Sequence, residues 1–182
     1  MSPQYRGAIR LVLFDVDGVL TDGTLYLDGE GECIKRFNVK DGIAVALLRS
    51  HGIATGILSA RSSPALTLRA QQLKFDVVVT GCDHKLSAYE QIKAERNLQD
   101  AQIAFVGDDV IDLAVIRAVG YACAPADAHA LVLRAAAYIA QCGGGHGVAR
   151  DVAEHLLIKG GLSREAAYAP LIELWSRHEV TQ

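Results

Sequence analysis

The sequence lacks the patterns expected of a zinc protein or of a disulfide-stabilised domain. Its four cysteines are widely spaced, without a Cys-x-x-Cys pair, and the six histidines complete no zinc-ligand pattern with them. We therefore expect free thiols rather than a metal centre or a disulfide framework. The cysteines are Cys33, Cys82, Cys123 and Cys142.

Long apolar runs and clusters of basic residues are missing as well. No apolar segment approaches the length of a membrane span, and the N-terminus has no apolar segment typical of a signal peptide. The net charge is −3 and no run of Lys and Arg is present to neutralise phosphates, which argues against a nucleic-acid partner. We interpret the chain as a cytoplasmic protein that binds neither membrane nor nucleic acid.

What the sequence does contain is an alternation of short apolar runs with amphipathic segments. This order is typical of βαβ units and predicts a doubly wound, Rossmann-like parallel sheet of the α/β class. A β-hairpin insertion is predicted around Asp28-Gly29, and Asp41 is expected to cap the first long helix. Strands are expected at 10–14, 53–58, 76–79, 103–106, 121–124 and 138–139, and helices at 41–50, 64–73, 85–96, 110–119, 127–135, 148–157 and 163–177.

We expect one domain over residues 1–182, because 182 residues suffice for a single full core. Its core would span about 8–158, followed by a C-terminal helical extension at about 163–178. The simplest interpretation of this extension is an amphipathic packing element. A glycine-rich segment, 142–147, precedes it and is not expected to form regular structure.

The most informative motif follows the first apolar strand. Asp15 and Asp17 stand one residue apart and are followed by Gly18 and, three residues later, Thr21. Two carboxylates this close repel unless a cation or a shared proton separates their roles. The bland alternative is a strand followed by an Asp-Gly turn.

Polar groups also follow other predicted strands, and such strand ends meet at one crevice of a parallel sheet. Each has an ordinary alternative: Ser59 could cap a helix, Lys85 could be solvated, and Asp108-Asp109 could be a capping pair. Together they indicate phosphoryl transfer through a covalent intermediate, in which one carboxylate attacks phosphorus and a second moves the proton. Mg²⁺ on oxygen ligands, a hydroxyl and a lysine would neutralise the phosphoryl oxygens. The groups are Ser59, Lys85, Asp108, Asp109 and Asp112.

These motifs resemble those of the haloacid dehalogenase-like phosphatases. The resemblance implies that Asp15 is the nucleophile and Asp17 the general acid/base, with Ser59 and Lys85 on the phosphate. It implies a Mg²⁺ site formed by Asp15, Asp17 (through its backbone carbonyl) and Asp108, with Asp109 and Asp112 supporting the metal and orienting Lys85.

No cap domain fits between the motifs, because Asp15 and Ser59 are 44 positions apart and Ser59 and Lys85 only 26. An uncapped site must accept a macromolecule or be covered by another subunit. The hairpin region, the segment 37–42 and the tail 143–150 resemble the 3-deoxy-D-manno-octulosonate 8-phosphate phosphatases. That family implies a homotetramer with hairpins in a central barrel, and a sugar phosphate as substrate. The alternative for the hairpin is an edge ornament, although its apolar face needs covering.

Candidate sugar contacts follow from the same resemblance. Arg61 follows the predicted crevice directly, whereas Arg69 lies mid-helix and could be plain surface. His146 stands where the family usually has arginine, and a histidine is shorter and only partly charged. The glycines around Gly144 could be only a linker. The predicted substrate-binding set is Gly18, Ser59, Ala60, Arg61, Arg69, Lys85, Gly144 and His146.

Other functions stay open at this point. The nine-carbon 2-keto-3-deoxynononate 9-phosphate is a rival substrate, and an uncapped phosphatase could act on a macromolecule. From another class, the domain could be a non-catalytic tetramerisation module of the kind fused to sugar-nucleotide synthetases. The complete catalytic set argues against the module.

Overall fold

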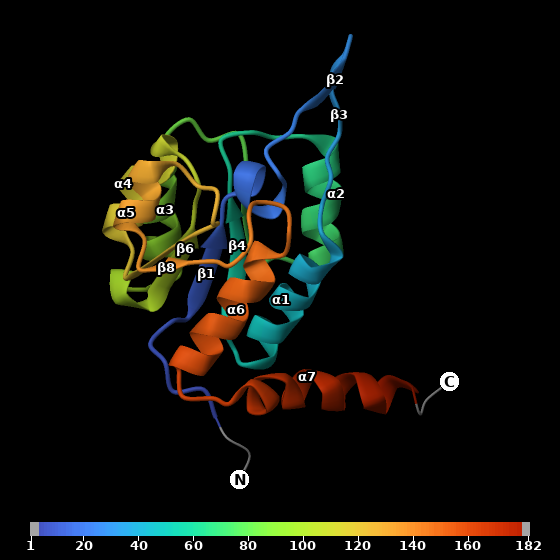
Figure 1. The fold of residues 1–182 in the computed structure, drawn as a ribbon, viewed down its shortest axis with the longest axis vertical. Coiled ribbons are helices and arrows are strands. Elements are labelled where there is room, and N and C mark those ends of the chain that lie inside the picture. Colours follow the sequence, from blue (N-terminus) through green and yellow to red (C-terminus); the bar gives the residue numbers. More distant parts are fainter. Residues whose placement is uncertain (1–3, 180–182) are drawn as a thin grey trace.

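The computed structural model describes residues 4–179 and contains a six-stranded parallel sheet. The strand order is β5-β4-β1-β6-β7-β8, and every neighbouring pair is parallel. The predicted doubly wound α/β sheet is therefore confirmed (Figure 1). The strands are β1 (Leu11–Phe14), β4 (Ala54–Leu58), β5 (Val77–Val79), β6 (Ile103–Val106), β7 (Tyr121–Ala124) and β8 (Tyr138–Ile139), and the helices are α1 (Val39–Ser50), α2 (Pro64–Leu73), α3 (Lys85–Glu95), α4 (Leu113–Ala118), α5 (Ala130–Ala135), α6 (Val148–Lys159) and α7 (Arg164–Glu179).

Helices cover both faces of this sheet. Side chains of α1, α2 and α6 pack in one buried cluster, and those of α3, α4 and α5 in a second cluster on the opposite face. Figure 1 shows the two groups on either side of the strands. Because both faces are buried, the strands are apolar throughout rather than alternating.

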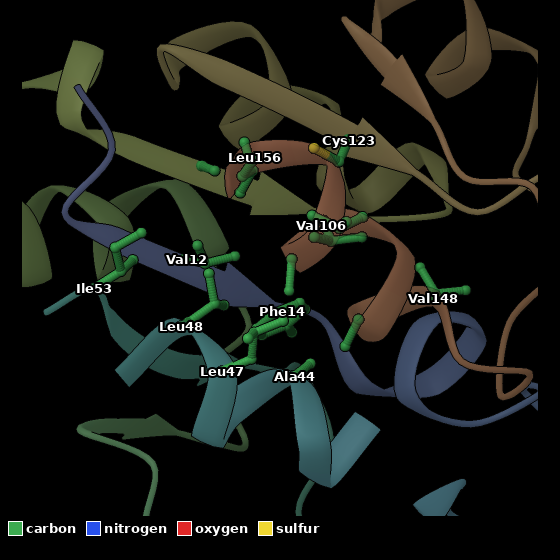
Figure 2. Close-up of a cluster of buried hydrophobic side chains, with 14 of the residues drawn as sticks. Val12, Phe14, Ala44, Leu47, Leu48, Ile53, Val106, Cys123, Val148 and Leu156 are labelled. Carbon is green, nitrogen blue, oxygen red and sulfur yellow. The ribbon is translucent and has the colours of Figure 1, made fainter. Parts of the chain in front are cut away.

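The central strand β1 divides its side chains between the two clusters. Val12 and Phe14 contribute to the α1 side, whereas Leu11 and Leu13 contribute to the other, as the two-residue period of a strand requires. Figure 2 shows Val12 and Phe14 close to Leu48 of α1. All four β1 side chains are fully buried, so the strand that supplies the Asp15 motif is fixed on both faces.

The order in which strands are added to the sheet reverses beside β1. From β1 the chain runs outward through β4 to β5, then returns across the sheet to β6 on the other side of β1. The loops after β1 and β6 therefore leave the sheet in opposite directions and open a crevice between them. The predicted catalytic and metal-binding residues follow these two strands, β4 and the loop after β5.

Besides α4, which begins at Leu113 after a short turn at 110–112 and not at 110, two helix starts differ from the sequence expectation. The cap of α1 is Asn38, whose side chain accepts a hydrogen bond from the Lys40 N–H at 3.0 Å, and not Asp41. Asp41 lies buried in the first turn, where it accepts the N–H of Ala149 at 3.1 Å. Burial raises the pKa of Asp41 to about 6. Asp41 thus ties α1 to the start of α6, a contact distant in sequence that local pattern cannot predict.

The second difference is the start of α5, which begins three residues later than predicted. Here His129 is the cap, and its Nδ1 accepts the Leu131 N–H at 3.2 Å. Asp127 lies in a turn that precedes the helix, and it lines the cleft.

The hairpin forms a separate two-stranded sheet and does not extend the edge of the main one. Its strands are β2 (Tyr26–Asp28) and β3 (Gly31–Ile34), and they project from one end of the molecule (Figure 1). The exposed apolar side chains there are Leu25, Tyr26, Leu27 and Ile34.

The C-terminal helix α7 crosses the opposite end, beneath α1 and α6 (Figure 1). Its Ala167 and Leu171 are buried in the α1 cluster, which fits the predicted packing role. Ile172 and Trp175 are about half exposed. Among residues 4–179, no helix combines the length and the apolar character that crossing a bilayer would require.

Candidate active site

Asp15 lies directly beyond β1 at the crevice. Its backbone N–H donates to the Val106 carbonyl of β6 at 2.9 Å, so the β1 end stays joined to β6. The next residues form a single turn, η1 (Val16–Leu20), which turns Asp17 back toward the crevice. Asp15 is buried, with only 4% of its surface exposed.

Gly18 allows the loops after β1 and β6 to approach closely. Its φ is +85°, and a Cβ atom at this position would stand 2.1 Å from Oδ2 of Asp108. Any larger residue would both strain the backbone and displace the Asp108 carboxylate. Gly18 therefore shapes the site through its missing side chain.

Lys85 lies between two carboxylates at the start of α3. Its Nζ is 2.8 Å from Oδ2 of Asp15 and 2.7 Å from Oδ1 of Asp112, and its side chain is 3% exposed. Oδ2 of Asp112 accepts the backbone N–H of Asp108 at 3.0 Å. The structure thus contains an ion pair between Lys85 and Asp112, and the role of Asp112 in orienting Lys85 for catalysis stays a prediction.

The electrostatics of this cluster show a shortage of positive charge. Burial, with the nearby Asp112 charge, raises the pKa of Asp15 to about 7, although Lys85 partly opposes the shift. Burial and the Asp15 charge also raise the pKa of Asp108 to about 7. Burial acts to lower the pKa of Lys85, but Asp15 and Asp112 outweigh it, so the net pKa is raised.

The donor set fits a hard divalent cation. Oxygen atoms of Asp15, Asp108 and Asp112 lie within 4.8 Å of one another, and Oδ1 of Asp108 is buried without a hydrogen-bond partner. Carboxylate oxygens are the ligands that Mg²⁺ prefers. The sequence had Asp17 as the third ligand through its backbone carbonyl. That part stays a prediction, and the third carboxylate gathered here, Asp112, is already bonded to Lys85.

Residues after β4 complete the wall of a cleft of about 330 Å³. Ser59 is buried, and its Oγ accepts the N–H of Arg61 at 3.2 Å, so it also holds the turn that leads to α2. The cleft brings together nearly all the predicted catalytic residues. It is lined by Asp15, Asp17, Gly18, Asp22, Gly23, Ser59, Ala60, Arg61, Lys85, Asp108, Asp109, Ile111 and Asp127.

Three predicted sugar contacts do not line this cleft. Arg69 donates to the Asn38 carbonyl at 3.3 Å, between α2 and the start of α1. Gly144 packs behind the β1 loop, where a Cβ would be 2.2 Å from the Gly18 carbonyl oxygen. His146 is exposed, and its Nδ1 is 2.7 Å from the Gly144 carbonyl.

Asp109 lines the cleft, but its side-chain hydrogen bond is local. Its side chain accepts the Val110 N–H at 2.7 Å and caps the short turn η3 (Val110–Asp112). The capping alternative is therefore present in the structure. The ion pair with Lys85 comes from Asp112.

Two sets of residues near the cleft are not among those predicted from the sequence. Asp127 follows β7 and accepts the Gly144 N–H at 2.9 Å, and the same strand-end rule that identified Asp108 would have found it. Lys35 and Glu32 come from the hairpin, and Lys35 is paired with Asp17. No sequence signal marks this pair, because it depends on how the hairpin folds back onto the site.

Known proteins are similar to this chain in sequence and in fold. A family model for haloacid dehalogenase-like hydrolases matches residues 75–151. The chain is 39% identical over 155 residues to the 3-deoxy-D-manno-octulosonate 8-phosphate phosphatase KdsC of Yersinia pestis, covering 85% of this chain and 83% of that protein.

Solved structures agree. A cobalt-bound deoxy-D-mannose-octulosonate 8-phosphate phosphatase from Haemophilus influenzae superposes with a TM-score of 0.82 at 36% identity, over 85% of this chain and 90% of that one. A Moraxella catarrhalis 3-deoxy-D-manno-octulosonate 8-phosphate phosphatase, in complex with magnesium, phosphate and KDO, gives 0.84 at 30% identity, over 90% and 94%. With its uncapped fold and strand-end carboxylates, the chain belongs to the KdsC family of haloacid dehalogenase-like hydrolases.

Proposed function

We propose that this protein is a Mg²⁺-dependent phosphatase that hydrolyses 3-deoxy-D-manno-octulosonate 8-phosphate, a step in lipopolysaccharide precursor synthesis. The observation that supports this best is the buried Asp15 beside Lys85 and Asp108 in one cleft. Relatives that share 30–39% of their residues with this chain are named for that reaction.

In the proposed mechanism, a carboxylate oxygen of Asp15 attacks phosphorus, and the bond from phosphorus to the sugar oxygen breaks. Asp17 gives its proton to that oxygen, which leaves as the sugar alcohol. Asp17 then takes a proton from a water molecule, whose oxygen attacks phosphorus and releases Asp15 and inorganic phosphate. Ser59 and Lys85 bind the phosphoryl oxygens and orient them for both displacements.

Asp15, Asp108 and the backbone carbonyl of Asp17 would hold the magnesium ion. When bound, it supplies the positive charge that lets an anionic carboxylate approach an anionic phosphate. Lys85 contributes a fixed positive charge beside Asp15, through the 2.8 Å ion pair. Asp112 holds Lys85 in that position.

The sugar end of the substrate would meet Arg61 and Ala60 at the mouth of the cleft. The Arg61 guanidinium is paired with Glu32 at 3.2 Å, but its side chain is 45% exposed, so its outer face can meet a sugar carboxylate. Arg69, Gly144 and His146 stay predictions as sugar contacts. The rival nine-carbon substrate would differ in this outer region and not at the phosphate.

Phosphate release from a panel of sugar phosphates tests the proposal. With Mg²⁺, we expect the highest kcat/KM on 3-deoxy-D-manno-octulosonate 8-phosphate, a lower value on 2-keto-3-deoxynononate 9-phosphate, and a loss of activity with EDTA that added Mg²⁺ restores. Higher kcat/KM on the nononate would reassign the substrate. No release from any phosphorylated keto-sugar acid would favour the tetramerisation module instead.

We also propose that the protein is a homotetramer joined through its hairpins. This is supported by the exposed apolar side chains of β2 and β3 and by the family resemblance. Leu27, 63% exposed, offers a direct test. Leu27→Asp should lower the mass measured by light scattering from that of four chains to that of fewer. Ile172 is a similarly exposed apolar residue on α7, and Ile172→Asp should leave the mass unchanged. An unchanged mass for Leu27→Asp would contradict the proposal.

The cytoplasmic location stays a prediction from the sequence. It is compatible with the four cysteines, all of which are described and free. A reducing compartment preserves such thiols.

A further inference from the structure

Lys35 follows β3 of the hairpin and is buried against the active site. Its side chain is 1% exposed, and its Nζ is paired with Oδ1 of Asp17 and lies 2.7 Å from Oε1 of Glu32. A lysine is rarely buried unless its charge is matched. Here both matching carboxylates lie at the mouth of the site, one on the hairpin and one on η1.

The two oxygens of Asp17 have different surroundings. Oδ1 contacts Lys35 and, at 3.4 Å, the hydroxyl of Thr21. Oδ2 is buried in the structure, has no hydrogen-bond partner among the described residues 4–179, and lies 3.7 Å from Nε of Arg61. Asp17 lines the cleft, so Oδ2 is the oxygen left to exchange a proton with a bound molecule.

The charges around Asp17 are balanced. Glu32 forms an ion pair with Lys35 through one oxygen, and its other oxygen accepts from Arg61 at 3.2 Å. Lys35, Glu32, Arg61 and Asp17 therefore form a closed ring of alternating charge. The Lys35 and Glu32 side chains are buried, that of Asp17 is partly buried, and that of Arg61 is exposed.

We propose that Lys35, supported by Glu32, is a positioning residue for proton transfer by Asp17. It fixes the carboxyl through Oδ1 and leaves Oδ2 as the oxygen that serves the leaving group. The inference rests on the proposed function, because it concerns the acid/base step of that reaction. Such a step needs the two heavy atoms at hydrogen-bond distance, so a freely rotating Asp17 would transfer its proton less often.

A structural role for Lys35 would be different in its consequences. If the lysine only attached the hairpin to the domain, its loss would lower stability or affect all substrates alike. If it positions Asp17, its loss affects only substrates whose leaving oxygen must be protonated. A sugar alkoxide needs that proton, whereas p-nitrophenolate leaves as an anion without it.

The experiment compares Lys35→Met with the unmodified protein on 3-deoxy-D-manno-octulosonate 8-phosphate and on p-nitrophenyl phosphate. The quantity measured is kcat/KM, which reports the steps up to departure of the leaving group. For Lys35→Met we expect kcat/KM to fall by about 10- to 100-fold on the sugar phosphate and by less than about 3-fold on p-nitrophenyl phosphate. Asp17→Asn should show the same selectivity with a larger loss on the sugar phosphate, about 10²- to 10⁴-fold. Glu32→Gln should give a smaller loss of the same selectivity.

Activity on p-nitrophenyl phosphate also shows that each variant is folded. Glu30→Gln, exposed at the turn of the same hairpin, is the matched control and should change neither value. Equal losses on both substrates, or no loss on either, would overturn the role of Lys35 while leaving the phosphatase proposal intact. If the Asp15→Asn and Asp17→Asn variants hydrolyse the sugar phosphate as fast as the unmodified protein does, the proposed function itself fails.

Discussion

Asparagine in place of Asp15 is expected to reduce phosphate release from the sugar phosphate by about 10⁴-fold or more. The amide cannot attack phosphorus as the carboxylate does, so no covalent aspartyl-phosphate forms. The change keeps the size of the buried side chain, and its oxygen can still accept from Lys85. We therefore expect a folded, inactive protein, checked by circular dichroism alongside the phosphate assay.

The matched control for this variant is Asp83→Asn. Asp83 is exposed on the loop before α3 and does not line the cleft, so kcat/KM should stay within about 3-fold, as for an ordinary surface change. Rapid acid quenching of the unmodified enzyme during turnover should trap a phosphorylated chain, and Asp15→Asn should show none. A variant that kept a few per cent of the activity would place the nucleophile elsewhere.

The parts of this site that could be predicted are those fixed by local sequence. Asp15 and Asp108 each follow a fully buried apolar strand of four residues, and such strands leave their carboxyl-end residues in one crevice. Ser59 and Lys85 follow by the same rule from β4 and from the loop after β5. Their meeting in one crevice can be predicted from the parallel order of the strands alone, without further knowledge of the tertiary structure.

The parts that could not be predicted depend on contacts between distant segments. Lys35 reaches Asp17 only because the hairpin folds over η1, and nothing in residues 31–36 indicates which way it folds. Arg69 lies on a helix face that turns toward Asn38 rather than toward the cleft, which is a matter of helix rotation. Asp41 was a plausible cap by composition, but Asn38 stands at the position where the backbone leaves the extended region.

A second large effect is expected from Lys85→Met. The methionine fills the volume of the buried stem but removes the cation between Asp15 and Asp112. Carboxylates left buried without their partner cost about 3–5 kcal/mol of folding stability. Since Lys85 also binds phosphate in the proposed mechanism, kcat/KM should fall by about 10²- to 10³-fold. Urea unfolding at neutral pH and the phosphate assay measure the two losses.

The loss of stability in Lys85→Met should depend on pH and on metal. The folded-state pKa values of Asp15 and Asp108, about 7, exceed the ordinary aspartate value of 3.8, so between these two pH values the folded protein binds more protons than the unfolded chain. The unfolding free energy therefore falls as pH rises through that window, and it should fall further without Lys85 because the carboxylate pKa values rise again. The loss of unfolding free energy in Lys85→Met should therefore be smaller at pH 5, where these carboxyl groups are protonated, than at pH 7.5. At pH 7.5, added Mg²⁺ should also make this loss smaller. Lys93→Met lies on the same helix, and its lysine pairs with the half-exposed Glu90 and Asp100, so this change should leave the free energy of unfolding nearly unchanged at either pH. A Lys85→Met deficit that is the same at pH 5 and 7.5, with and without Mg²⁺, would mean that Lys85 stabilises the fold by packing and not by balancing the Asp15–Asp108–Asp112 charges.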